Sequence, residues 1–181
     1  MVFRILQIVA DSTPLLTVAA LLEAVSVGVM FQKIGYLKDT FGVGEPPDTW
    51  FGISPDKFYD YLNKLGPDGC QAYGRVNSWD FFPYMPAYMI LLGAMLLLQC
   101  RSAGISLNIS WLFPVAMFFD IIESSIFGYA TRQFPEHLSN MLINVASIAN
   151  QIKWASFLFG LVALVGLFAN NSMRRTKSHH Q

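Results

Sequence analysis

Four ionisable residues lie inside stretches of the sequence that are otherwise apolar. Glu23 interrupts the first stretch, Asp120 and Glu123 lie in the third, and Lys153 lies early in the fourth. An ionisable side chain within a membrane span costs about 2.5 kcal/mol or more at the centre of the bilayer, so it is a candidate for function. Such groups can carry a proton, bind a cation or hold the polar head group of a lipid.

The spacing predicts that these side chains lie close together. Asp120 and Glu123 are three residues apart and share one face of a helix. In a bundle of four antiparallel spans, Glu23 and Lys153 fall in the same half of the bundle as this pair, and Asn150 adds a neutral amide there. Three carboxyls and one ammonium cannot all be ionised at low cost, so the cluster binds protons, or water or an ion enters it.

Three interpretations of this cluster are open. In the first, the cluster is buried and partly protonated, and it fixes the register of the helices. In the second, it is a pocket for a proton, a cation or a lipid head group. In the third, it contacts a basic residue of a partner subunit. Asp120 and Glu123 resemble half of a di-iron helix, but such sites need a Glu-x-x-His on each of two helices. No histidine lies in an apolar stretch, which also excludes bis-histidine haem ligation. We expect no metal and no cofactor.

The elements that position these residues are membrane spans. Only 13% of the residues are charged and 54% are hydrophobic, whereas a soluble domain carries about a quarter charged residues. A span needs roughly 20 mostly apolar residues, and four stretches qualify, at about residues 14–32, 83–99, 107–130 and 148–169. The sequence predicts an all-α fold, an integral membrane four-helix bundle that forms one domain over residues 1–181.

The long first loop, residues 33–82, is predicted to be partly helical. Ser54 and Pro55 are typical of a helix start, Gly66 ends that helix, and a second short helix runs through Tyr73. The loop forms either a helical cap on the bilayer surface or a lid over a substrate pocket.

Small residues recur at four-residue intervals on three spans, a pattern that lets helix backbones approach closely. They are Ala20, Ala24 and Gly28 in the first span, Ala116, Ser124 and Gly128 in the third, and Ser156 and Gly160 in the fourth. These stripes predict close helix contacts within the bundle, or docking faces for the helices of another protein.

Basic residues predict the orientation. Arg4, Arg101, Arg174, Arg175 and Lys177 flank the side that both termini share with the loop between the second and third spans. By the positive-inside rule this side is cytoplasmic, matrix or stromal, and we expect an organelle inner membrane in preference to the plasma membrane. The last three of these residues anchor the chain at anionic lipid head groups or form a partner-binding tail.

A set of motifs in the first loop and the third span resembles a group of small, functionally uncharacterised four-span membrane proteins. The matching residues are Phe51-Gly52-Ile53-Ser54-Pro55, Leu65-Gly66-Pro67-Asp68-Gly69, Tyr73, Asp80, Phe82-Pro83 and Phe119-Asp120-Ile121-Ile122-Glu123. The group reads FGYSP, LG..GR..Y and D..FP in its loop, and FD..EN in its third span. Here Cys70 replaces the arginine and Ser124 replaces the asparagine. The resemblance implies the four-span topology and draws attention to Asp120 and Glu123, but it implies no activity.

Two functions follow from these features. The expected one is a non-enzymatic accessory or structural subunit of a larger membrane complex of the respiratory, ATP synthase or photosynthetic type. It is favoured by the small size, by the stripes of small residues and by the absence of GxSxG, Walker A and GxGxxG motifs, and we assign no catalytic residue. The alternative is a small intramembrane enzyme or binding protein that acts on a lipid or a proton through the buried cluster. The expected partners are membrane lipids and other transmembrane subunits, with no nucleic acid, because the formal net charge is zero.

Overall fold

The computed structural model describes residues 1–178, with side chains as far as Arg174, and this part of the chain contains helices and loops but no strand. The helices are α1 (Val2–Ala10), α2 (Thr13–Phe41), α3 (Pro55–Trp79), α4 (Met85–Ala103), α5 (Leu112–Gln133) and α6 (Asn140–Ser178). The short helical segments η1 (Pro47–Thr49), η2 (Asp80–Tyr84) and η3 (Leu107–Trp111) connect them. The prediction of an all-α fold is confirmed.

Four helical stretches are long and apolar enough to cross a membrane, as the sequence predicts. They are Thr13–Phe41, Pro55–Ala103, Leu107–Gln133 and Asn140–Arg174. With 29 residues, α2 is about 44 Å long at 1.5 Å per residue, which exceeds the roughly 30 Å of bilayer hydrocarbon.

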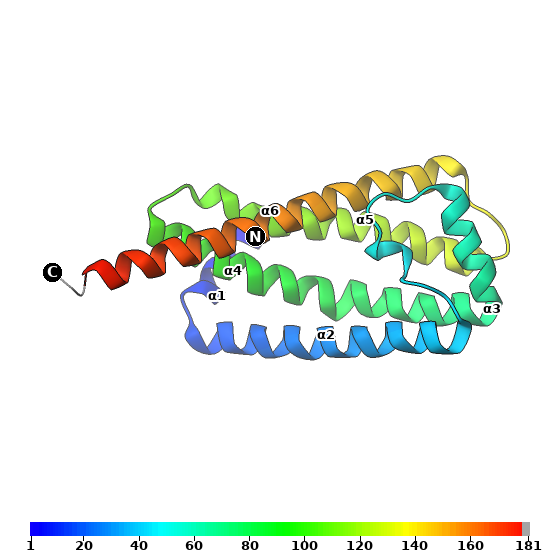
Figure 1. Ribbon diagram of the computed structural model, residues 1–181, viewed down its shortest axis with the longest axis horizontal. Helices are drawn as coiled ribbons and strands as arrows, with labels where there is room; N and C mark the ends of the chain where they lie inside the picture. The colour runs from blue at the N-terminus through cyan, green and yellow to red at the C-terminus, as the bar shows by residue number, and fades with distance from the viewer. Residues whose placement is uncertain (179–181) are drawn as a thin grey trace.

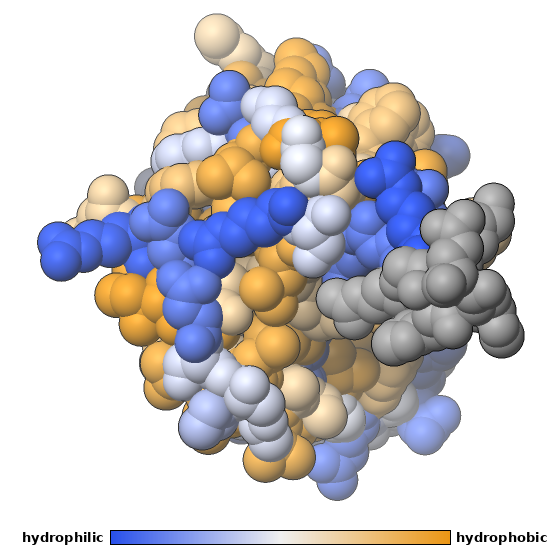
Figure 2. Space-filling model, turned by 90° about the vertical axis from the view of Figure 1, so that its left-hand side faces the viewer, coloured by the Kyte–Doolittle hydropathy of each residue, from blue (hydrophilic) through white to orange (hydrophobic). Residues whose placement is uncertain are grey.

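The long helices lie side by side, with α3 and the loop after α2 at one end of the bundle (Figure 1). The connection between α4 and α5 and the last turns of α6 lie at the opposite end. Figure 2 views this second end, where hydrophilic groups project beside hydrophobic surface. The bundle therefore has two distinct ends, and the first of them holds the only long connection among the described residues.

Local sequence signals set the starts of two helices. The Ser12 hydroxyl accepts a hydrogen bond from the backbone N–H of Leu15 at 3.4 Å, with a proline in the first turn of α2. The Ser54 hydroxyl accepts one from the N–H of Lys57 at 3.4 Å at the start of α3. A serine cap satisfies one of the N–H groups that have no partner within the helix. The helix start predicted at Ser54 and Pro55 is confirmed.

The first loop is shorter and more helical than the sequence indicates. Helix α2 continues to Phe41, so the connection to α3 covers only residues 42–54 and includes the short segment η1. Gly66 breaks α3 with a φ of 64°, as predicted, but the helix after the break runs on to Trp79 instead of ending near Tyr73. A π-helical segment, η2, then leads into α4. Helix α4 begins at Met85, just after the break in helical geometry at Phe82 and close to the start at residue 83 that the sequence predicts for the second span.

Two further elements differ from the predicted boundaries. Helix α6 begins at Asn140 and ends at Ser178, beyond both limits of the expected span at 148–169. Helix α1 was not predicted at all. It packs against α4, where Leu6 is fully buried, and a Cβ atom at Gly93 would lie 3.0 Å from the Leu6 side chain.

The stripes of small residues are buried on some helices and exposed on another. Ala116 and Ser124 on α5 and Gly160 on α6 are buried, and Gly128 and Ser156 are half-buried. By contrast, the stripe of α2 faces outward, since its members Ala20, Ala24 and Gly28 are exposed. Of the two predicted roles, the stripe of α2 therefore does not form a close contact within the bundle, and a docking face for another helix stays a prediction. The bundle is reached instead by the face of α2 that carries Ala19, Ser26 and Met30.

Candidate functional site

Lys153 on α6 is the centre of a buried polar cluster. Its Nζ atom lies 2.6 Å from Oε2 of Glu123 and 3.3 Å from Oδ1 of Asp120. It also donates a hydrogen bond of 3.1 Å to the backbone carbonyl of Asp48. Only 8% of Lys153, 5% of Asp120 and none of Glu123 is exposed. An ammonium group has three N–H donors, and three oxygens therefore surround this one, two in ion pairs and one in a hydrogen bond.

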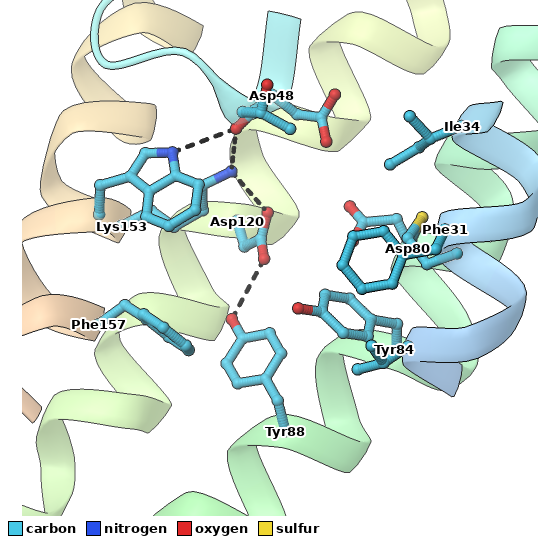
Figure 3. A pocket seen from close by; sticks show the side chains of 13 residues that line it. Phe31, Ile34, Asp48, Asp80, Tyr84, Tyr88, Asp120, Lys153 and Phe157 are labelled. Atoms are coloured by element: carbon cyan, nitrogen blue, oxygen red, sulfur yellow. Dashed lines mark hydrogen bonds and ion pairs between the residues drawn. The ribbon is translucent and has the colours of Figure 1, made fainter. Parts of the chain in front are cut away.

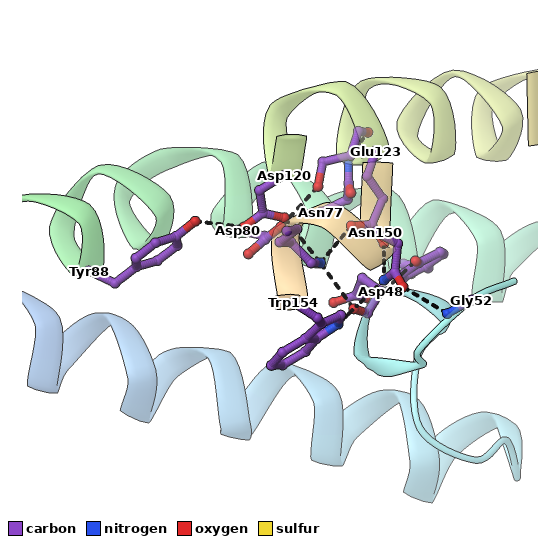
Figure 4. Close-up of polar contacts among 12 residues, drawn as sticks. Asp48, Gly52, Asn77, Asp80, Tyr88, Asp120, Glu123, Asn150 and Trp154 are labelled. Carbon is purple, nitrogen blue, oxygen red and sulfur yellow. Dashed lines mark hydrogen bonds and ion pairs between the residues drawn. The ribbon is translucent and has the colours of Figure 1, made fainter. Parts of the chain in front are cut away.

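Asn150, one turn before Lys153, ties the same cluster to the loop. Its Nδ2 atom donates to Oε1 of Glu123 at 2.9 Å and to the carbonyl of Asp48 at 3.2 Å. Its Oδ1 atom accepts from the backbone N–H of Gly52 at 3.0 Å. The side chain of Asn150 therefore has a partner for its carbonyl oxygen and two for its amide group (Figure 4).

Residues 48–53 of the loop dock on α6 through further bonds. Trp154 Nε1 donates to the carbonyl of Asp48 at 3.2 Å, and Ser147 Oγ accepts from the N–H of Ile53 at 2.8 Å. The Asp48 carbonyl thus accepts from three side chains of α6, namely Asn150, Lys153 and Trp154. This loop segment closes the end of the bundle above the cluster.

A second carboxyl pair lies beside the first. Asp80 in η2 is only 7% exposed, and its Oδ2 atom accepts a hydrogen bond of 3.0 Å from the Ser124 hydroxyl. The Tyr88 hydroxyl donates to Oδ2 of Asp120 at 3.2 Å. The break in helical geometry at Phe82 lies between Asp80 in η2 and Tyr88 in α4.

The cluster holds more acid than base. Asp48, Asp80, Asp120 and Glu123 contribute four carboxyls, and Lys153 is the one cation paired with any of them among the described residues. Burial raises the pKa of the Asp48 carboxyl, although the ammonium of Lys153 acts in the opposite direction. Carboxylates that are not neutralised by a cation are costly to bury. The cluster therefore needs protons or a further cation.

A cavity of about 260 Å³ opens beside the cluster, between α2 on one side and α6 on the other (Figure 3). Three carboxyl residues line its polar end, and aliphatic and aromatic side chains line its walls. The lining residues are Val27, Met30, Phe31, Ile34, Asp48, Thr49, Asp80, Tyr84, Tyr88, Asp120, Lys153, Trp154 and Phe157. Helix α2 packs against α1, α3 and α4. The cavity lies on another side of α2, in the space between α2 and α6.

The structure brings together Asp120, Glu123, Lys153 and Asn150, four of the five residues that the sequence singles out for the cluster. Glu23 does not join them. It is half-buried on α2, and its Oε2 atom is buried without a hydrogen-bond partner among the described residues.

Sequence reasoning missed several members of the site. Asp80 belongs to the motifs that carry the family resemblance, but nothing in the sequence indicates that it is buried. Asp48 is one of many acids in the loop, and no local pattern distinguishes it. Tyr88 and Trp154 look like ordinary interfacial aromatics, and their polar atoms matter only once the helices are paired.

The predicted lipid-contacting tail is described only in part. Arg174 is exposed at the end of α6, whereas the side chains of Arg175 and Lys177 lie outside the described residues. Their role at lipid head groups remains a prediction.

No family model, curated protein or solved structure matches the chain. The resemblance to four-span proteins therefore stays a prediction, and what the protein does has to follow from the contacts and the cavity described above.

Proposed function

We propose that the protein is a multi-pass membrane protein that binds a hydrophobic molecule from the bilayer in the cavity between α2 and α6. The polar end of this ligand contacts the carboxyls at the closed end, and its apolar part lies along Phe31, Ile34 and Phe157. The observation that supports this most is the cavity itself, which is apolar along its walls and carries buried charge at one end. Ligand pockets commonly combine a mainly apolar lining with a few polar groups that orient the ligand.

Exposed apolar side chains support placement in a membrane. The outer faces of α2 and α6 carry them in continuous runs, including Leu21, Leu22 and Val25 on α2 and Leu158, Phe159, Val162 and Val165 on α6, each more than half exposed. Apolar patches of this extent are rare on soluble monomers. In a bilayer these side chains contact lipid hydrocarbon and are not exposed to water.

The position of the loop supports entry from the side. Residues 48–53 are fastened to α6 by side-chain bonds to Ser147, Asn150, Lys153 and Trp154, so they close the cavity at the end of the bundle. Phe31 lines the cavity and is 71% exposed. The ligand therefore enters past Phe31, between the two helices, from the hydrocarbon of the bilayer.

A cavity-filling variant tests this function. The protein is purified into nanodiscs from its source membrane, and retained molecules are identified by native mass spectrometry and solvent extraction. Val27→Trp places an indole in the cavity and should abolish retention. Val25→Trp is the matched control, because Val25 is 62% exposed on the same helix, and it should retain the molecule. Equal retention by both variants, or no retained molecule in the parent protein, contradicts the proposal.

A second candidate function, an accessory subunit of a membrane complex, is favoured by one observation. The stripe of Ala20, Ala24 and Gly28 is exposed on α2, and a Cβ atom at Gly28 would meet nothing within 4 Å. Small residues on an open helix face let another helix approach closely. Gly28→Leu should then remove a stoichiometric partner in mild detergent without changing the Tm of the isolated chain. A parent chain that purifies alone counts against this function.

For the orientation, we propose that the end holding the α4–α5 connection faces the cytoplasm, matrix or stroma. Arg101 in the last turn of α4 forms an ion pair with Asp11 there, and basic residues near short loops stay on the inner side. A single cysteine introduced at Ser102 should react with a membrane-impermeant maleimide only in inside-out vesicles.

A further inference from the structure

Some hydrogen-bond acceptors that line the cavity have no donor from the protein. This indicates what kind of polar group a ligand must bring. The nitrogen donors that line the cavity are engaged by the protein itself. Lys153 forms ion pairs with Glu123 and Asp120 and donates a hydrogen bond to the Asp48 carbonyl, and Trp154 donates to that same carbonyl. An anionic ligand would therefore compete with two carboxyls and a carbonyl for the ammonium of Lys153.

Two of the three hydroxyl groups that line the cavity donate to protein oxygens as well, and the third, that of Tyr84, donates no hydrogen bond to the described residues. Tyr88 donates to Asp120, and Thr49 donates to the carbonyl of Pro46 at 2.8 Å. The hydroxyls of Tyr88 and Thr49 each have one O–H donor, and each donates it to a protein oxygen. A ligand that needs a donor from these groups would have to break an existing bond.

Acceptor atoms, by contrast, are left without partners. Asp120 is 5% exposed and lines the cavity, and its Oδ1 atom accepts no hydrogen bond from the described residues, although Lys153 Nζ lies 3.3 Å away. Asp80 is 7% exposed, also lines the cavity, and receives one hydrogen bond, from Ser124 to Oδ2. No lysine or arginine in the described part of the chain forms an ion pair with Asp80. Two buried carboxyls thus face one cavity with oxygen atoms to spare (Figure 3).

On these grounds we propose that the ligand of the cavity is a hydrophobic amine, whose ammonium group lies between Asp80 and Asp120. This inference rests on the proposed function, because it names the chemical class of the molecule that the cavity takes. An ammonium supplies N–H donors for these carboxyl oxygens. It also adds positive charge to a site in which four carboxyls face one lysine. The hydrocarbon of the same molecule lies against Ile34 and Phe157.

Other head groups fit the site less well. A carboxylate or phosphate head would find one free donor, the Tyr84 hydroxyl, but it would meet the carboxyls of Asp48, Asp80 and Asp120, and like charges in a buried site repel. A neutral hydroxyl would satisfy one acceptor but would leave the excess negative charge uncompensated. The order of affinity expected for equal hydrocarbon chains is therefore amine, then alcohol, then acid.

Three probes of equal length test this order, namely tritiated decylamine, decan-1-ol and decanoic acid. Saturable binding is measured on the purified chain in nanodiscs of uncharged lipid, and binding to empty nanodiscs is subtracted. Decylamine should bind at least about tenfold more tightly than decan-1-ol, and decanoic acid should bind most weakly. Asp80→Asn should reduce the preference for the amine over the alcohol at least about fivefold, whereas Asp60→Asn, an exposed acid paired with Lys64, should leave it unchanged.

The outcomes separate this inference from the function on which it rests. Equal affinity for amine and alcohol, or an amine preference that survives Asp80→Asn, overturns the inference but leaves the binding cavity in place. No saturable binding of any probe overturns both. The Tm and elution volume of Asp80→Asn must match those of the parent. If this variant does not fold, Ser124→Ala, which removes the hydrogen bond to Asp80 Oδ2, is used, and an unchanged amine-to-alcohol ratio in that variant counts against the inference.

Discussion

The ammonium of Lys153 and the carboxylate of Glu123 lie 2.6 Å apart, and both side chains are buried in the bundle. They come from α6 and α5, the two helices that pack most extensively against each other. Separating such a pair leaves a buried charge without a partner, which costs more than the intact pair contributes. This pair therefore has a large effect on whether α5 and α6 pack correctly.

Lys153→Met should lower the free energy of unfolding by about 3–5 kcal/mol, because it leaves Asp120 and Glu123 as buried acids without their cation. The measurement is equilibrium unfolding by SDS in mixed micelles. In a background of Glu123→Gln the same substitution should cost about 1–3 kcal/mol less, since the two residues are coupled.

Lys64→Met is the control for this experiment. Lys64 pairs with Asp60 at 2.7 Å on the surface, and both side chains are more than 60% exposed. Exposed ion pairs contribute about 1 kcal/mol or less. Strictly additive effects of the substitutions at 153 and 123 would show that the buried pair is not coupled.

Asn150→Ala should release the loop segment 48–53 from α6. The substitution removes the acceptor of the Gly52 N–H and one donor to the Asp48 carbonyl, and each buried polar group left unpaired costs about 1–3 kcal/mol. Hydrogen exchange of the amides of Gly52 and Ile53 should become faster, whereas exchange in the middle of α4 should not change.

Ile148→Ala on the same helix serves as the comparison, because Ile148 is 59% exposed. It should leave exchange in the loop at the rate of the parent. Unchanged protection of Gly52 in Asn150→Ala would mean that the amide of Asn150 does not hold the segment in place.

The sequence was sufficient for the parts of the molecule that depend on local patterns. Apolar runs of about 20 residues identify the long helices, and the serine–proline pairs and Gly66 mark where helices begin or break. The three-residue spacing of Asp120 and Glu123 places both on one helix face. Each of these features is set by residues within a few positions of one another in the chain.

What could not be predicted depends on contacts between distant segments. Asp48 joins the cluster through its backbone carbonyl, which every residue has, so its side chain gives no signal. Asp80 is buried because α3 continues into η2 toward the bundle, and no local pattern indicates that path. The outward orientation of Ala20, Ala24 and Gly28 could not be predicted either. A stripe of small residues has the same sequence pattern whether it packs inside the bundle or faces outward.

Gly160→Val should destabilise the bundle, whereas Gly28→Val should not. A Cβ atom at Gly160 would lie 2.9 Å from the ring of Phe113, which is fully buried, and a Cβ atom at Gly28 would meet nothing within 4 Å. Overpacking a close helix contact costs about 1–3 kcal/mol. The Tm of Gly160→Val should fall below that of Gly28→Val, and Phe113→Leu should restore part of the loss. Equal Tm values for the two glycine variants would contradict the close approach of α5 and α6.

The Asp48 carboxyl should make stability depend on pH. Burial raises its pKa above the ordinary value of 3.8, so the folded chain binds this proton more tightly than the unfolded chain does. Stability then falls as the pH rises from 3.8 through the higher pKa of the folded state, since the folded chain releases the proton later. The Tyr73 hydroxyl donates to Oδ1 of this carboxyl, and an amide oxygen can accept the same bond.

Asp48→Asn should therefore be more stable than the parent above the folded-state pKa, and the two should converge as the pH falls toward 3.8. The measurement is the Tm of both proteins in the same detergent from about pH 3 to about pH 8, a range that brackets ordinary carboxyl titration. Asp60→Asn, at an exposed position, should run parallel to the parent across this range. A difference between Asp48→Asn and the parent that stays constant with pH would show that this carboxyl does not titrate differently in the folded chain, because only a difference in proton binding between the two states produces a slope.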